Sequence, residues 1–293
     1  GVDLNVNLKL FNALFLVLMF GTCLAQVDSY KPYVLASVAP ASVKAKLEAE
    51  GFVVVGEYKP YDGAEVIVVT SDALKHLAAK SDKGGYGAVI RVAITDQPVL
   101  DKSQVPPQVS YSNPKYWANG YRMETQTELH DVATALEKAL GNNGEFGSKK
   151  GLSESDLREY QYTWGMPDFT DQIKLAAHPS YEDAVSTVEK NLTDGKGDTQ
   201  FVYRVDVANK NETVFGIGVT KGKGADKHVM TTLNHLTHTA YMPYEILVSG
   251  KEVYMLPGRF RIALSFPDLG MGAFMDIFSA PGAIKEAVEA VAK

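Results

Sequence analysis

The sequence predicts an α+β fold made of two similar halves that are related as a pseudo-twofold duplication. The order helix, strand, strand, helix, strand, strand is expected once before residue 141 and again after residue 151. Short phrases also recur about 145 residues apart. Gly51-Phe-Val-Val54 is echoed by Gln200-Phe-Val-Tyr203, and Tyr111-Ser-Asn-Pro114 by Tyr254-Met-Leu-Pro257. Chance similarity between two α+β halves is the alternative explanation.

Local patterning defines the elements of the first half. Pro40 suits the start of a helix whose Val43 and Leu47 share one face. Runs of β-branched residues predict the strands, and Ser71 is expected to cap the second helix. The expected elements are a helix at 41–50, strands at 52–58 and 65–70, a helix after Ser71, strands at 88–94 and 108–112, and a helix at 127–140.

The second half is expected to follow a linker at 141–151, which is rich in Gly, Asn and Lys. Ser180 and Asp183 resemble a capping box at the start of a helix. The expected elements are that helix, strands at 201–207 and 213–219, a mixed segment at 228–238, and strands at 244–248 and 252–255. These expectations divide the chain into a first half at 26–147 and a second half at 148–293.

Residues 1–25 have the pattern of a secretory signal peptide. Lys9 precedes an apolar run at 10–20, and Cys23-Leu-Ala25 places small side chains before Gln26. A membrane anchor is the alternative, but the run is shorter than the roughly 20 residues that span a bilayer. A lipoprotein signal at Cys23 is a further alternative. The sequence therefore predicts a periplasmic or secreted bacterial protein with no stable membrane span after cleavage.

Composition excludes several classes of function. The chain has 293 residues, a formal net charge of −6 and one cysteine. An acidic chain is a poor electrostatic partner for nucleic acid, and cleavage after Ala25 would leave no thiol for catalysis or disulfides. The sequence contains no GxSxG, HExxH or CxxC motif.

Three longer phrases carry a resemblance to a known family. They are Gln108-Val-Ser-Tyr-Ser-Asn-Pro114, Tyr160-Gln-Tyr-Thr-Trp-Gly-Met-Pro167 and Phe260-Arg-Ile-Ala-Leu-Ser-Phe-Pro-Asp-Leu269. With them, about residues 30 to 293 resemble a two-copy, exported branch of the bacterial domain of unknown function 302. The resemblance implies two-layer α/β sandwich halves, similar to TATA-binding-protein-like folds. The family has no established activity to carry over.

Histidines are concentrated in one segment, where His228, His235 and His238 lie within eleven residues. On a continuous helix they would share one broad face and could hold a metal ion or haem iron. Nearby glycines and threonines weaken a helix there, and only Asp226 and Glu245 are near as supporting carboxylates. Histidines that only hydrogen-bond within a polar junction are the alternative. No metal site is predicted, and the cofactor is left unknown.

Arginine and tyrosine residues give a second set of candidates. If Arg259-Phe-Arg261 is a strand, both guanidinium groups point to one side and could grip a carboxylate or phosphate. Tyr121-Arg122 would form the equivalent site in the first half, and Tyr244 belongs to the many tyrosines that suit either a ligand cleft or ordinary sheet edges. A solvated sheet face is the alternative for the arginines.

The sequence thus predicts a non-catalytic exported protein that binds a small apolar or anionic ligand in a cleft between its halves. The candidate ligand-binding residues are His235, His238, Tyr244, Arg259, Arg261, Tyr121 and Arg122. A histidine-centred metal or haem protein or enzyme is one alternative, and a structural interaction protein of the envelope is another. The oligomeric state is not predicted.

Overall fold

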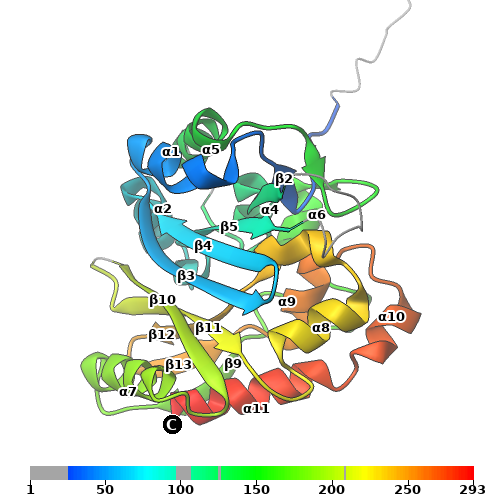
Figure 1. The fold of residues 1–293 in the computed structure, drawn as a ribbon. Coiled ribbons are helices and arrows are strands. Elements are labelled where there is room, and N and C mark those ends of the chain that lie inside the picture. Colours follow the sequence, from blue (N-terminus) through cyan, green and yellow to red (C-terminus); the bar gives the residue numbers. More distant parts are fainter. Residues whose placement is uncertain (1–25, 97–106, 125–126, 208) are drawn as a thin grey trace, which may run out of the picture.

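The computed structural model describes residues 26–96, 107–124, 127–207 and 209–293 (Figure 1). These residues form a mixed α+β fold, which confirms the predicted class. Within them, an eleven-stranded sheet has the order β7-β2-β6-β5-β4-β3-β10-β11-β12-β13-β9, and β1 pairs separately with β8. Every strand pair is antiparallel. The predicted signal peptide lies outside the described residues.

Eight of the thirteen described strands correspond to sequence-based expectations, whereas β1, β2, β7, β8 and β9 were not expected. The predicted strands at 108–112 and 252–255 are found with those bounds. The strands are β1 (Ser29–Tyr30), β2 (Tyr33–Leu35), β3 (Val53–Tyr61), β4 (Ala64–Thr70), β5 (Ile90–Thr95), β6 (Gln108–Ser112), β7 (Glu145–Phe146), β8 (Leu152–Ser153), β9 (Ile173–Ala177), β10 (Thr199–Val207), β11 (Glu212–Val219), β12 (Tyr244–Ser249) and β13 (Glu252–Met255).

The helices begin where their caps predict. Ser71 Oγ accepts the backbone N–H of Leu74 at 3.3 Å, and Ser180 Oγ accepts that of Asp183 at 3.0 Å. The helices are η1 (Pro40–Ser42), α1 (Val43–Ala49), α2 (Asp72–Lys80), η2 (Gly84–Gly87), α4 (Pro114–Gly120), α5 (Thr127–Leu140), α6 (Glu154–Arg158), α7 (Tyr181–Thr193), α8 (Asp226–Leu233), η3 (Leu236–Tyr241), α9 (Gly258–Ser265), α10 (Met271–Asp276) and α11 (Ala280–Ala292). None of the described helices is long and apolar enough to cross a membrane.

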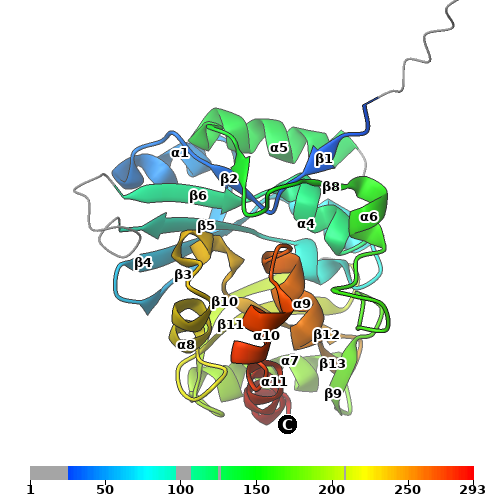
Figure 2. The ribbon, with the colours of Figure 1, turned by 90° about the vertical axis from the view of Figure 1, so that its right-hand side faces the viewer.

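Helices cover the sheet at both ends of the molecule, with α1 and α5 at one end and α7 and α11 at the other (Figure 2). Between these ends, helical segments from each part of the chain pack against strands of the other part. The segment η3 contacts β4, β5 and β6, and α8 contacts β3. In turn, η2 contacts β10, β11 and β12, and α2 contacts β10. The centre of the molecule is therefore a shared core and not a loose seam between two independent bodies.

Tyrosines fill much of this shared core instead of lying mainly at sheet edges. Tyr33, Tyr116, Tyr121, Tyr203 and Tyr241 are all buried. The hydroxyl of Tyr33 donates to the Ser265 carbonyl at 2.8 Å, and that of Tyr116 donates to the Leu264 carbonyl at 2.6 Å. These bonds satisfy buried hydroxyl groups while they tie β2 and α4 to the end of α9.

One local prediction was wrong. Residues 259–261 belong to helix α9 and not to a strand, because Pro257 precedes a run of residues with good helical propensity. The segment 228–238 is mixed, as expected, and is not one continuous helix. Helix α8 ends at Leu233, Asn234 adopts the left-handed conformation with φ 55°, and η3 follows. The predicted linker at 141–151 contains β7, which pairs with β2 at the edge of the sheet.

Candidate functional site

Helix α9 carries two arginines that point away from each other. Residues two positions apart on an α-helix are about 200° apart around its axis, so Arg259 and Arg261 cannot form the predicted fork. Arg259 is partly exposed and lies over the ring of Phe278 at 5.7 Å, whereas Arg261 is 2% exposed. Helix α9 therefore places Arg259 at an outer groove and Arg261 in a buried polar network.

The outer groove lies where the first turns of α9 and α11 meet. It contains about 810 Å³ of empty space, part of which is open to solvent. Its lining is mainly apolar and consists of Pro167, Ile173, Pro257, Gly258, Arg259, Phe278, Ser279, Pro281, Gly282 and Lys285. No side chain caps either helix, and neither first turn contains an acidic residue. The positive ends of two helix dipoles therefore face this region without a protein anion to balance them.

The groove is also positively charged through its side chains. Arg259 and Lys285 line it, and neither forms an ion pair with a carboxylate among the residues that the structure describes. A second hollow of similar size, about 800 Å³, is different because Asp156 and Glu159 line it together with Trp164. Only the first of these two hollows combines apolar walls with cationic groups.

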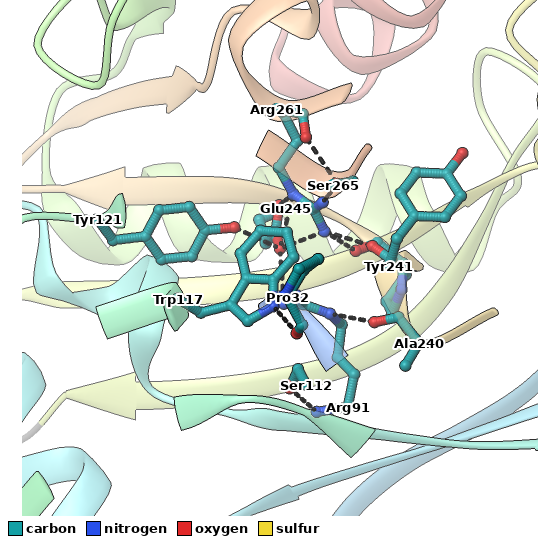
Figure 3. A network of polar contacts seen from close by, with 11 residues as sticks. Pro32, Arg91, Ser112, Trp117, Tyr121, Ala240, Tyr241, Glu245, Arg261 and Ser265 are labelled. Carbon is teal, nitrogen blue, oxygen red and sulfur yellow. Dashed lines mark hydrogen bonds and ion pairs between the residues drawn. The ribbon is translucent and has the colours of Figure 1, made fainter. Parts of the chain in front are cut away.

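The buried network lies at the other side of α9 (Figure 3). Glu245 on β12 accepts from Arg261, with 2.9 Å between Nε and Oε2. Arg91 on β5 approaches the same carboxylate, with 3.4 Å between its Nη1 and Oε1. Arg91, Glu245 and Arg261 are 1%, 4% and 2% exposed, so one carboxylate is shared by two guanidinium groups away from water.

Aromatic side chains surround these charges. The guanidinium carbons of Arg91 and Arg261 lie 4.4 Å and 4.9 Å from the ring centre of Trp117. The hydroxyl of Tyr121 donates to Glu245 Oε1 at 3.4 Å. Burial lowers the pKa of the Arg261 guanidinium, but Glu245 together with Tyr121 and Tyr33 opposes this effect, and the net result is a raised pKa. Burial raises the pKa of Tyr121 although both arginines oppose it, so the phenol stays neutral.

The histidines do not form a metal site of the kind considered from the sequence. His235 and His238 stack with ring centres 5.0 Å apart, and His238 also stacks on Phe266 at 5.1 Å. Within the described part of the chain there is no group of three or more His, Cys, Asp or Glu residues that could hold a metal ion. Burial and the nearby His235 lower the pKa of His238 to about 3, so its ring is neutral at ordinary pH.

The predicted site residues are therefore divided among several places. Arg261 and Tyr121 belong to the buried network, and Tyr244 borders it, with its ring 6.0 Å from the Arg261 guanidinium carbon. Arg259 lies in the groove. His235 and His238 lie in the aromatic cluster, and Arg122 pairs with Asp168 at 3.2 Å. The structure brings together Arg261, Tyr121 and Tyr244 and separates the others from them.

Sequence reasoning missed Arg91, Trp117 and Lys285, and it noted Glu245 only as an acid near the histidines. A signal for two of them exists. Arg91 is the single charged residue in the apolar run 88–94, and Glu245 is the single charged residue in the run 244–248. An isolated charge in a buried strand needs a partner, so each position predicts the other.

A separate buried carboxyl group lies at the start of α8. Asp226 accepts the Tyr58 hydroxyl at 2.9 Å and the Val219 N–H at 3.4 Å. Burial raises the pKa of Asp226 to about 7, although both hydrogen bonds oppose this change.

Comparisons with protein-family models, with curated proteins and with solved structures find no match to this chain.

Proposed function

We propose that the protein binds an anionic amphiphile, which is a molecule with a carboxylate or phosphate head and a short apolar body, and does not transform it. The proposed site is the groove between the first turns of α9 and α11. The observation that carries the proposal is the pair of cations, Arg259 and Lys285, which form no direct ion pair among the described residues and lie in a groove whose other walls are mainly apolar.

Each part of such a ligand has a matching surface. A carboxylate or phosphate head can accept from the Arg259 guanidinium and the Lys285 ammonium, and it is further favoured by the two helix N-termini. An apolar body can pack on Ile173, Phe278 and Pro281. Phe278 is 54% exposed, so a ligand over its ring would remove apolar surface from water.

The proposal of binding without catalysis is supported by the groove's side chains. Ser279 is the only hydroxyl-bearing residue among the described residues that line it, and none of those residues is His, Cys, Asp or Glu. A serine without a neighbouring base is not an activated nucleophile.

We also propose that the two parts of the chain are duplicated halves, in line with the resemblance to domain of unknown function 302. The strand orders β2-β6-β5-β4-β3 and β9-β13-β12-β11-β10 support this, since each runs first, fifth, fourth, third, second along its half. In both halves a proline lies at the start of the helix that follows the fifth of these strands, with Pro114 as the first residue of α4 and Pro257 directly before α9.

The positions of two hollows, one in each part of the chain, also support the proposed duplication. A smaller hollow of about 390 Å³ is lined by Val34 of β2, by Pro114 and Lys115, and by Glu137 of α5. The proposed groove occupies the corresponding place in the second half, beside β9, Pro257 and α11. We therefore propose a ligand site in the second half, and not between the halves as the sequence predicted, because Arg91, Glu245 and Arg261 are packed at the centre. The predicted signal peptide would place this binding outside the cytoplasm.

Calorimetric titration tests the proposed function. Octanoate and octyl phosphate are expected to bind with one site per chain, whereas octyl glucoside and octyltrimethylammonium are expected to bind at least about tenfold more weakly. The double variant Arg259→Ala and Lys285→Ala is expected to lose this preference. Lys223→Ala, which changes an exposed lysine outside the groove, is the matched control. Equal affinity for charged and neutral octyl compounds, or an unaffected double variant, would contradict the proposal.

A further inference from the structure

We propose that a single halide-sized anion, of which chloride is the ordinary example, binds inside the protein beside Arg91 and completes the charge balance of the buried network. This site is separate from the groove, and the inference does not depend on the function proposed for that groove.

The first argument compares the hydrogen-bond acceptors available to the side-chain nitrogens of Arg261 and Arg91. All three nitrogens of the Arg261 side chain donate to oxygens of Glu245, Ser265, Tyr241 or Pro243. Arg91 has fewer acceptors: its Nε donates to the Ala240 carbonyl at 2.8 Å, its Nη1 makes a long contact to Glu245, and its side chain also lies near the Tyr121 hydroxyl. Arg91 Nη2 is buried and has no hydrogen-bond partner among the described residues. An acceptor is needed at this nitrogen, since a buried charged donor without one is costly.

The second argument is charge. The network contains two guanidinium groups and one carboxylate, and all three residues are at least nine-tenths buried. Tyr121 cannot supply a second negative charge, because burial raises the pKa of its phenol. The ring of Trp117 offsets part of the positive charge. One anion would bring this set of charges to neutrality, which a water molecule would not.

The third argument is the space available. A narrow, partly open hollow is lined by Arg91, Trp117 and Tyr121, and by apolar side chains that include Leu77 and Met123. It has room for about one water-sized sphere, so a carboxylate or phosphate group is too large for it, and a halide, which is slightly larger than a water molecule, fits with a small outward shift of the lining side chains. A buried water usually makes two to four hydrogen bonds with both donors and acceptors, and these mainly apolar walls offer few. A halide needs only donors and a positive field, both of which Arg91 provides.

Trp117 provides a direct reporter for this site. The chain has two tryptophans, and Trp164 is 95% exposed. In a Trp164→Phe background, Trp117 is the only tryptophan and lies against the proposed anion. The protein is prepared in sodium gluconate, and chloride or bromide then replaces gluconate at constant ionic strength. Bromide is expected to quench Trp117 fluorescence in a saturable way, and the melting temperature is expected to rise by about 5 °C or more when chloride reaches about one hundred times its Kd.

The Arg91→Met variant tests the assignment. It removes the unpartnered donor and leaves Glu245 paired with Arg261, so the network becomes neutral and the protein is expected to fold. Its melting temperature is expected to be the same in chloride and gluconate. Arg204→Met is the matched control, because Arg204 also stacks on a ring, that of Phe215 at 5.9 Å, but pairs with Glu189 and Asp206. This control is expected to keep the full chloride response.

Diffraction from bromide-soaked crystals of the unaltered protein gives a second test that does not depend on any variant folding. One bromide anomalous peak is expected within hydrogen-bond range of Arg91 Nη2. Electron density for water with no bromide signal, or a melting temperature that is the same in chloride and gluconate, would overturn the proposal.

Discussion

Arg91 and Glu245 lie 154 positions apart in the chain and meet inside the molecule, with 3.4 Å between Nη1 and Oε1. Each is the second residue of its strand, Arg91 in β5 and Glu245 in β12. Through Arg261, the same carboxylate also joins β12 to α9. A single buried group thus connects the two parts of the chain with the helix whose first turn lines the groove.

Replacement of Glu245 by glutamine is expected to destabilise the protein strongly. The substitution leaves two buried guanidinium groups without a counter-charge, and the loss of one member of a buried ion pair typically costs about 3–5 kcal/mol. Urea unfolding at neutral pH measures the change. Glu252→Gln is the control, because its partner Lys174 is more than half exposed, and it is expected to cost much less stability than Glu245→Gln. Similar costs for the two variants would contradict this view of the network.

Asp226 is expected to make stability fall as pH rises. Its pKa increases from 3.8 to about 7 on folding, so the folded state holds a proton that the unfolded state releases between these values. In the unaltered protein, this titration should lower the free energy of unfolding by up to roughly 4 kcal/mol between pH 4 and pH 8. Asp226→Asn should abolish this decrease. Unfolding free energies at several pH values provide the measurement. Asp62→Asn, at an exposed turn, should keep the slope of the unaltered protein; a slope that survives in Asp226→Asn would count against the assignment.

His238 is expected to act in the opposite direction. Burial and His235 lower its pKa from 6.5 to about 3, so the unfolded state binds a proton first and stability is lost as pH falls from about 6.5 towards 3. His238→Gln should therefore reduce the loss of stability at low pH. This effect is clearest in the Asp226→Asn background, where the opposite pH dependence of Asp226 is absent. The exposed His130 provides the control variant, His130→Gln. The assignment fails if both histidine variants give the same acid unfolding curve.

A glycine in the groove allows a steric test. Gly282 lines the groove, and a Cβ built on it meets nothing within 4 Å. Gly282→Phe is expected to fill the groove and weaken octanoate binding by about tenfold or more, while stability changes by about 1 kcal/mol or less. Gly272, in α10, has equally open surroundings but is not among the groove residues, so Gly272→Phe is the matched control. Undiminished binding by Gly282→Phe would place the ligand elsewhere.

The sequence predicted elements well where the pattern is local. Strand β6 and helix α5 were predicted with the bounds they have, because hydrophobic periodicity and capping residues specify them. The helical state of Arg259 and Arg261 was missed, since alternation of charge and ring over three residues favours a strand when the following helix is not recognised. Because of this error, the two arginines were expected on one face, whereas Arg259 lines the groove and Arg261 is buried in the core.

Long-range pairing was the part that the sequence could not supply. Lys285 contributes to the groove only because α11 begins beside α9, and Arg91 meets Glu245 only because η3 packs against β5. Such pairing depends on how elements far apart in the sequence pack in three dimensions, which local patterns do not specify. The isolated charges at Arg91 and Glu245 are a signal that was not used, and they indicate that each residue needs a buried partner of opposite charge.

Photo-crosslinking with a diazirine-bearing fatty acid, followed by peptide mapping, tests the central claim most directly. The account predicts that labels fall within residues 257–285 or around Ile173, which also lines the groove, and that octanoate competes for them. Labels at residues 152–164, which line the other large hollow, or labelling no greater than that by an uncharged diazirine alcohol, would contradict it.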